Sequence, residues 1–115
     1  MENLQKSGLS KEELSILIQY KEILLNEYSH KIDSIILYGS KARGDFGEDS
    51  DIDLLISIKD YDWKMGDKIR RIGYSLDAGI DYKFSIIVVP NHNLEKMKKE
   101  NYQFGINLVN DGIIV

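Results

Sequence analysis

Two short apolar runs, separated by a polar segment, constrain the fold of this chain most strongly. The first run is residues 35–37 (Ile-Ile-Leu), and it is followed closely by a Gly39-Ser40 pair. The second run is residues 54–56 (Leu-Leu-Ile), and it is preceded by the tripeptide Asp51 to Asp53. Apolar runs of this length, bounded by glycine and polar residues, are typical of buried strands. The sequence therefore predicts one strand that ends in a glycine turn and another that begins with two acids.

Asp51 and Asp53 are the first candidate site residues. Alternate side chains of a strand share a face, so the two carboxylates point the same way with Cα atoms about 7 Å apart. Two like charges held this close repel each other, and one of the carboxylates tends to stay protonated. A divalent cation removes the conflict, and Mg²⁺ is commonly held by one or two carboxylates together with substrate phosphates. The pair therefore predicts a Mg²⁺ site, and the simpler alternative is that both acids begin a solvated strand face.

Gly39 and Ser40 supply the complementary feature. A tight turn at this position offers backbone N–H groups and a hydroxyl to bound phosphates. A local structural role is compatible with this, because glycine permits unusual dihedral angles and serine caps short helices. Lys41 and Arg43 lie within one helical turn of Ser40, so either side chain can reach a triphosphate. For Lys41 a surface role is an equal alternative.

The same residues resemble a known family. Gly39-Ser40, a ten-residue spacer and Asp51 to Asp53 are similar to the motif of the DNA polymerase beta-like nucleotidyltransferases. The resemblance is densest over residues 40–45 and 50–55, and it points to the small members called minimal nucleotidyltransferases. Many of these are antitoxins paired with HEPN-domain toxins. The resemblance implies that Ser40 and nearby N–H groups contact the phosphates of an NTP, with ATP as the expected donor.

The position of a third carboxylate is the open question of the site. Active members of the family usually carry an acid in the middle of the following strand, where it helps to activate the attacking hydroxyl. Alignment of the apolar run 86–89 with that strand puts Ser85 at this position. Asp81 has the same parity as Ser85 but lies about 13 Å away along an extended strand. We therefore expect Asp51, Asp53 and, through a bulge or another register, Asp81 as catalytic residues; alternatively Asp81 is a polar residue that opens the strand.

The hydrophobic periodicity and turn residues predict an α/β (α+β) domain, and the resemblance implies the polymerase beta-like nucleotidyltransferase fold, with a small mixed β-sheet flanked by helices. Ser10 and Glu13 form a capping box at the start of the first long helix. We expect a single domain over 1–115, with an N-terminal helix in 1–30, a catalytic core in 31–89, and a C-terminal helical segment and short strand in 90–115. The expected elements are helices at 11–28 and 61–76, a short helical piece ending near residue 44, a loop through residue 49, strands at 32–38, 51–58 and 81–89, one broken or two short helices after 93, and a last strand at 113–115.

Composition excludes several classes of protein. The net charge of −4 argues against non-specific nucleic-acid binding, which depends on neutralising many phosphates. No apolar run approaches the length of a membrane span, and the first residues contain no apolar secretory core. The chain has no cysteine, which excludes disulfides and thiolate metal sites. We therefore expect a cytoplasmic protein with no membrane association.

The expected function is Mg²⁺-dependent transfer of AMP from ATP to a hydroxyl group. Family members that hold their own acceptor carry a further domain, for which 115 residues leave no room. This favours an antitoxin that adenylylates its partner toxin. One alternative is a binding module without catalysis that neutralises a partner by occlusion, which Ser85 in place of an acid would favour. Another is a small-molecule nucleotidyltransferase with a separate acceptor-binding subunit.

Overall fold

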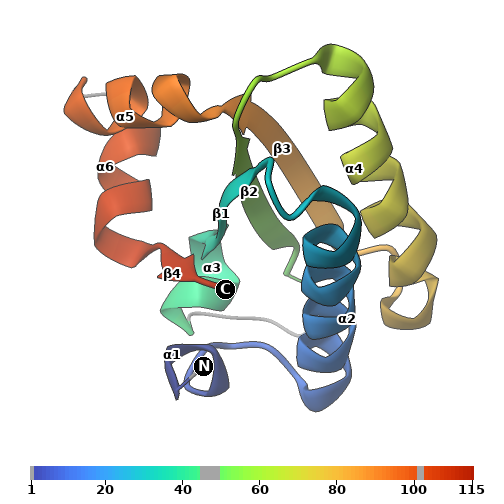
Figure 1. The fold of residues 1–115 in the computed structure, drawn as a ribbon. Coiled ribbons are helices and arrows are strands. Elements are labelled where there is room, and N and C mark those ends of the chain that lie inside the picture. The colour runs from blue at the N-terminus through green and yellow to red at the C-terminus, as the bar shows by residue number, and fades with distance from the viewer. Residues whose placement is uncertain (1, 45–49, 101–102) are drawn as a thin grey trace.

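One four-stranded sheet forms the centre of the computed structural model, which describes residues 2–44, 50–100 and 103–115 (Figure 1). The strand order is β3-β2-β1-β4. Strand β1 is antiparallel to both of its neighbours, whereas β2 and β3 are parallel, so the sheet is mixed as the resemblance implied. The strands are β1 (Ile32–Tyr38), β2 (Ile52–Ile58), β3 (Phe84–Pro90) and β4 (Ile113–Ile114).

Helices cover both faces of this sheet. Helices α2 (Lys11–Tyr28) and α4 (Trp63–Leu76) lie on one side, and α5 (Asn91–Lys99) and α6 (Gln103–Asp111) lie on the other (Figure 1). The alternation of β2 explains this arrangement: its even-numbered residues are buried in the core beneath α2 and α4, whereas Leu55 packs with the apolar residues of α5 and α6. Three shorter helices complete the described fold: α1 (Glu2–Gln5), α3 (Gly39–Arg43) and the 3₁₀ helix η1 (Asp77–Ile80).

The predicted α/β architecture is confirmed, and α2 and β1 have the predicted bounds. The capping box also forms: the Ser10 hydroxyl accepts from the N–H of Glu13 at 3.1 Å, and the Glu13 carboxylate accepts from the N–H of Ser10 at 2.8 Å. The tail forms two short helices rather than one broken helix. Helix α1 was not predicted, because four residues are too few to show a hydrophobic period. Residues 45–49 of the predicted loop lie outside the described residues.

Four strand boundaries differ from the prediction: β3 ends at Pro90 and β4 ends at Ile114, each one residue from the predicted end, and two strands begin late. Strand β2 begins at Ile52, one residue late, and β3 begins at Phe84 rather than at Asp81. The late start of β3 has a clear backbone cause. Asp81 and Tyr82 have φ angles of 61° and 58°, in the left-handed region, so the chain cannot be extended there. The prediction that Asp81 lies on the strand is therefore wrong.

Side chains cover the outer edge of β3. Lys83 turns its carbonyl toward β2 and accepts from the N–H of Ile52 at 2.8 Å, so even-numbered residues of β3 turn their N–H groups outward. Phe84 donates to the carboxylate of Asp77 at 3.2 Å, and Ile86 donates to the hydroxyl of Tyr74 at 3.1 Å. Pro90 falls on the same outward parity, so its missing N–H breaks no bond to β2. Covered in this way, β3 presents a poor template for pairing with another chain.

Within the described ranges, no helix combines the length and the apolar character that a membrane crossing requires.

Candidate active site

The candidate site lies where β1 ends and β2 begins. Gly39 and Ser40 are the first residues of α3, directly after the last residue of β1. In the antiparallel ladder that last residue, Tyr38, pairs with Asp53. Strand pairing therefore brings the glycine turn and the acids together, across a spacer of ten residues.

Asp53 lies directly against the glycine turn. Gly39 has a φ of 78°, and a Cβ built on it would lie 2.5 Å from Oδ2 of Asp53. Any other residue would both adopt a left-handed backbone and collide with the carboxylate. The glycine turn and the Asp53 carboxylate are thus in direct contact, which the absence of a side chain at position 39 allows.

The electrostatics of the site centre on Asp53. Burial, and then the charge of Asp51, raise the pKa of the Asp53 carboxyl, while the Arg43 guanidinium opposes them. Asp51 is exposed at the start of the strand. Besides burial, the charge of Asp51 therefore acts against ionisation of Asp53, in the direction that the sequence predicts.

Tyr38 is a site neighbour that sequence reasoning missed. Burial and the charge of Asp53 raise the pKa of its hydroxyl to about 12, so the phenol stays protonated beside the carboxylate. Its ring packs edge-on against Phe104 of α6, with centroids 5.3 Å apart. Its place before the glycine turn was visible in the sequence, but its pairing with Asp53 is a matter of strand register.

Arg43 is the last residue of α3, within one helical turn of Ser40. Its guanidinium approaches the carboxylate of Asp111, at the end of α6, with 3.6 Å between Nη1 and Oδ2. Its positive charge also acts on Asp53, where it opposes the rise in the pKa of that carboxyl. Asp111 was not predicted as a neighbour, because only the return of the chain along β4 and α6 brings it here.

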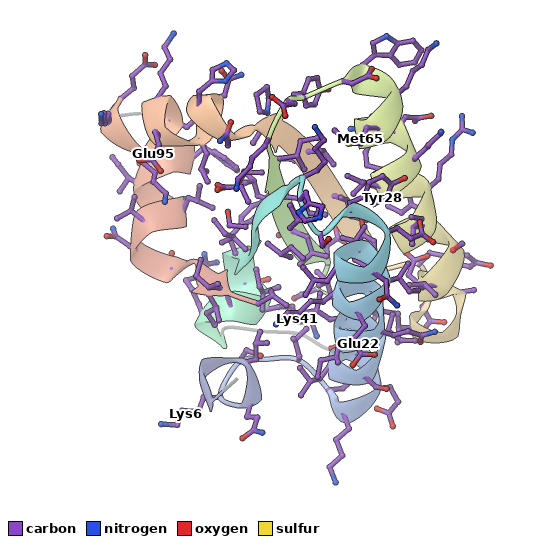
Figure 2. All side chains as sticks on the ribbon, viewed as in Figure 1. Lys6, Glu22, Tyr28, Lys41, Met65 and Glu95 are labelled. Atoms are coloured by element: carbon purple, nitrogen blue, oxygen red, sulfur yellow. The ribbon has the colours of Figure 1, made fainter. Side chains whose placement is uncertain are left out.

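Lys41 is buried rather than exposed on the surface. Its side chain is buried between α3 and α2 (Figure 2), with Nζ 3.0 Å from Oε1 of Glu13 and 3.4 Å from the carbonyl oxygen of Gly8. Lys83 adds a second ammonium, 3.3 Å from Oε2 of the same glutamate. The surface role expected as the alternative for Lys41 is therefore wrong, and its ammonium is committed to Glu13.

Glu13 joins three parts of the site region. Burial by itself would raise the pKa of its carboxyl, but the Ser10 N–H and the ammonium groups of Lys41 and Lys83 together hold it below the usual value. Glu13 belongs to α2, Lys41 belongs to α3, and Lys83 is the residue directly before β3. This cluster fixes α3 against the body of the domain.

Ser85 occupies the strand position at which we looked for a third carboxylate. In the parallel ladder Ser85 pairs with Asp53, so the alignment that placed it there agrees with the observed register. Asp81 lies four residues earlier, is exposed, and caps the end of η1. The argument that placed Asp81 and Ser85 on one strand face fails, because the chain is left-handed at Asp81 and Tyr82.

The donor set fits a hard divalent cation only in part. Among residues 2–44, 50–100 and 103–115, no group of three or more acids or histidines is arranged to hold a metal ion. Two carboxylates remain, and this is the number with which Mg²⁺ is commonly held when phosphate oxygens and water fill its other positions. The raised pKa of Asp53 is the observation that favours such a cation, since positive charge would relieve it.

Comparison with known proteins agrees with this geometry. Residues 17–109 match the nucleotidyltransferase domain family. Two relatives come from Methanocaldococcus jannaschii: "Putative protein adenylyltransferase MJ0141" is 37% identical over 80 residues, covering 67% of this chain and 75% of the relative. "Putative protein adenylyltransferase MJ0604" is 31% identical over 99 residues, covering 84% and 91%. The chain therefore belongs to the nucleotidyltransferase domain family, and it is a nucleotidyltransferase of the minimal, polymerase beta-like kind.

The raised pKa of Asp53 predicts a stability effect with a definite sign. The native state holds this proton more tightly than the unfolded chain, so stability falls as pH rises from the ordinary aspartate range through the raised value. Asp53→Asn removes this cost, and without metal it should be more stable than the parent at neutral pH. The advantage should vanish in acid. Thermal unfolding in a chelating buffer from about pH 3 to pH 8 measures this, with Glu22→Gln on the exposed side of α2 as the control.

Gly39→Ala should damage the turn far more than Ser40→Ala. The alanine must adopt a left-handed backbone, which costs about 1–2 kcal/mol, and its Cβ must displace Asp53. Ser40→Ala should keep the melting temperature and weaken MgATP binding in a calorimetric titration. Gly79→Ala is the matched control, because a Cβ there meets nothing within 4 Å. Unchanged melting and MgATP affinity in Gly39→Ala would refute the contact.

Lys41→Met should destabilise the fold strongly. Removal of one partner of a buried pair typically costs about 3–5 kcal/mol, because the other charge stays buried. The double variant Glu13→Gln/Lys41→Met should be less destabilised than the sum of the single variants. Since the pKa of Glu13 is lowered, its contribution is present above the ordinary glutamate range and is lost as pH falls through the lowered value. Urea unfolding of the four proteins measures the coupling; additive losses would refute it.

Proposed function

We propose that this nucleotidyltransferase is a magnesium-dependent protein adenylyltransferase, which moves AMP from ATP to a hydroxyl of a partner protein. One contact carries the proposal: the carboxylate of Asp53 lies against Gly39, the first residue of the turn. An acid able to hold a metal and a turn able to hold phosphates thus adjoin each other. Nucleotidyl transfer requires both at one place.

Asp51 and Asp53 are the residues that would hold the metal. When bound there, Mg²⁺ supplies positive charge to the phosphate oxygens and aligns the attacking and leaving groups. The mutual repulsion of the two acids supports this role, because the pair is costly without a cation.

The other residues would bind and orient the triphosphate. The N–H groups at the start of α3 and the Ser40 hydroxyl can donate to the β- and γ-phosphates. Arg43 adds a positive charge near the acids, and Asp111 holds its guanidinium in place. The acceptor oxygen then forms a bond to the α-phosphorus, the bond to the β-phosphate breaks, and pyrophosphate leaves.

The relatives support a protein as the acceptor, since both are named as protein adenylyltransferases. The partner that the family resemblance suggests is a HEPN-domain toxin, with this chain as its antitoxin. ATP is the proposed donor, because both relatives are named as adenylyltransferases. Asp81 remains a proposed third catalytic residue, although it lies before β3 rather than on it.

A second function is favoured by one observation. Ser85, rather than an acid, pairs with Asp53, so the site has a hydroxyl where a third carboxylate would help to activate the acceptor. A catalytically inert module that neutralises its partner by occlusion would have such a site.

Incubation with ATP, Mg²⁺ and a candidate HEPN-domain partner separates the two functions. We expect the partner to gain the mass of AMP, and the gain to disappear with Asp53→Asn or with a chelator. Ser85→Asp should increase the rate if a carboxylate is missing, and Asp81→Ala should lower it only if Asp81 serves as the third acid. Intact-mass spectrometry is the measurement. No gain, together with undiminished neutralisation by the Asp51→Asn/Asp53→Asn variant, would establish the inert module.

A further inference from the structure

The turn before β3 presents an aromatic side chain in a strained conformation. Tyr82 is 73% exposed, more than any other large hydrophobic residue within the described segments. It and Asp81 are consecutive left-handed residues, with φ of 58° and 61°. This backbone region is costly for residues other than glycine, and such strain gathers at functional sites when the surrounding structure holds it.

Asp77 holds this turn on both sides of Tyr82. The Tyr82 N–H donates to the backbone carbonyl of Asp77 at 2.9 Å, and the Phe84 N–H donates to its carboxylate at 3.2 Å. Asp77 itself is buried, with 2% of its surface exposed. The exposed tyrosine is thus mounted on a fixed support.

Strand pairing places this turn beside the acid pair. The N–H of Ile52 donates to the carbonyl of Lys83 at 2.8 Å, and Asp51 and Tyr82 are the residues immediately before these two. Adjacent chains in a sheet are about 4.8 Å apart. Asp51 and Tyr82 lie just outside the strands, each one residue from this hydrogen bond, and the tyrosine side chain is longer than the spacing between the chains. A rotation of the exposed Tyr82 side chain toward β2 would therefore bring its hydroxyl over the start of that strand.

The order of elements along this end of the sheet assigns a side to the acceptor. The turn at Gly39 follows β1, the acid pair begins β2, and Tyr82 precedes β3, with β2 between the other two strands. In phosphoryl transfer the attacking and leaving oxygens are roughly in line. With pyrophosphate held at α3, the attacking oxygen approaches from the β3 side, where Tyr82 lies.

We propose that the hydroxyl of Tyr82 is an intramolecular acceptor, so that this enzyme adenylylates itself when no partner occupies the acceptor side. The inference rests on the proposed function. The phenolic oxygen bonds to the α-phosphorus of ATP, the bond from that phosphorus to the β-phosphate oxygen breaks, pyrophosphate leaves with the electron pair, and the phenolic proton passes to water. Tethering a nucleophile in this way raises its effective concentration, which favours transfer to Tyr82 over transfer to a hydroxyl that is free in solution.

Self-modification would limit the activity of the enzyme. An AMP ester on Tyr82 would fill the side from which a partner hydroxyl must approach. Modified chains should therefore adenylylate a partner more slowly than unmodified chains or than the Tyr82→Phe variant.

The test uses the purified chain with ATP and Mg²⁺ and no partner. Intact-mass spectrometry should show one AMP per chain, and peptide mapping should place it on Tyr82. Tyr82→Phe keeps the ring and should gain no mass. Tyr61→Phe is the matched control: Tyr61 is also exposed, at 39%, but it follows the opposite end of β2 and should leave labelling unchanged. Labelling per chain should not depend on protein concentration.

The inference is overturned if the parent binds MgATP but gains no mass, if AMP lies on another residue, or if labelling rises with protein concentration, which would indicate transfer between copies. The proposed function can fail separately. It fails if the parent does not bind MgATP or does not label a protein partner, whereas the Tyr82→Phe variant should still label that partner.

Discussion

The contact between the Asp53 carboxylate and Gly39 is the constraint on which the site depends. It exists because Tyr38 and Asp53 pair in the antiparallel ladder, which fixes the end of β1 against the start of β2. Burial, and then the charge of Asp51, raise the pKa of Asp53, and burial, and then the charge of Asp53, raise the pKa of Tyr38. The arrangement is costly for the protein without a ligand, and a cation with bound phosphates would relieve that cost. The cost of the free site and the proposed binding of a nucleotide would then have one physical origin.

A second interaction holds this arrangement in place. The Glu13 carboxylate accepts from the ammonium groups of Lys41 and Lys83. A single buried carboxylate of α2 therefore holds both α3 and the start of β3. Buried ion pairs contribute little net stability compared with apolar packing, but removal of one partner is costly. The pair therefore specifies where α3 lies. The residues of this cluster act on the site indirectly, by fixing α3, the helix that would contact a substrate.

The start of β3 decides what kind of nucleotidyltransferase this is. Ser85 pairs with Asp53, and the residues before it form a rigid left-handed turn held by Asp77. A hydroxyl therefore pairs with the acid of β2, and an exposed tyrosine stands in the turn that precedes β3. Catalysis, occlusion and self-modification differ in what happens at the start of β3, where an acceptor would lie, and not in how phosphates would be bound at α3.

The sequence by itself determined the local features. The capping box set the start of α2, alternation in β2 set which of its residues face α2 and α4, and the Gly39-Ser40 pair marked the turn, because each depends on residues close together in the chain. Tertiary structure decided the rest. Lys41 turned inward because Glu13, 28 residues away, offered it a buried carboxylate. The pairing of Tyr38 and Asp53, the approach of Asp111 to Arg43, and the left-handed turn that removed Asp81 from β3 all depend on strand register and on chain segments that meet only in the folded state. The local sequence pattern carries no information about contacts between such distant segments.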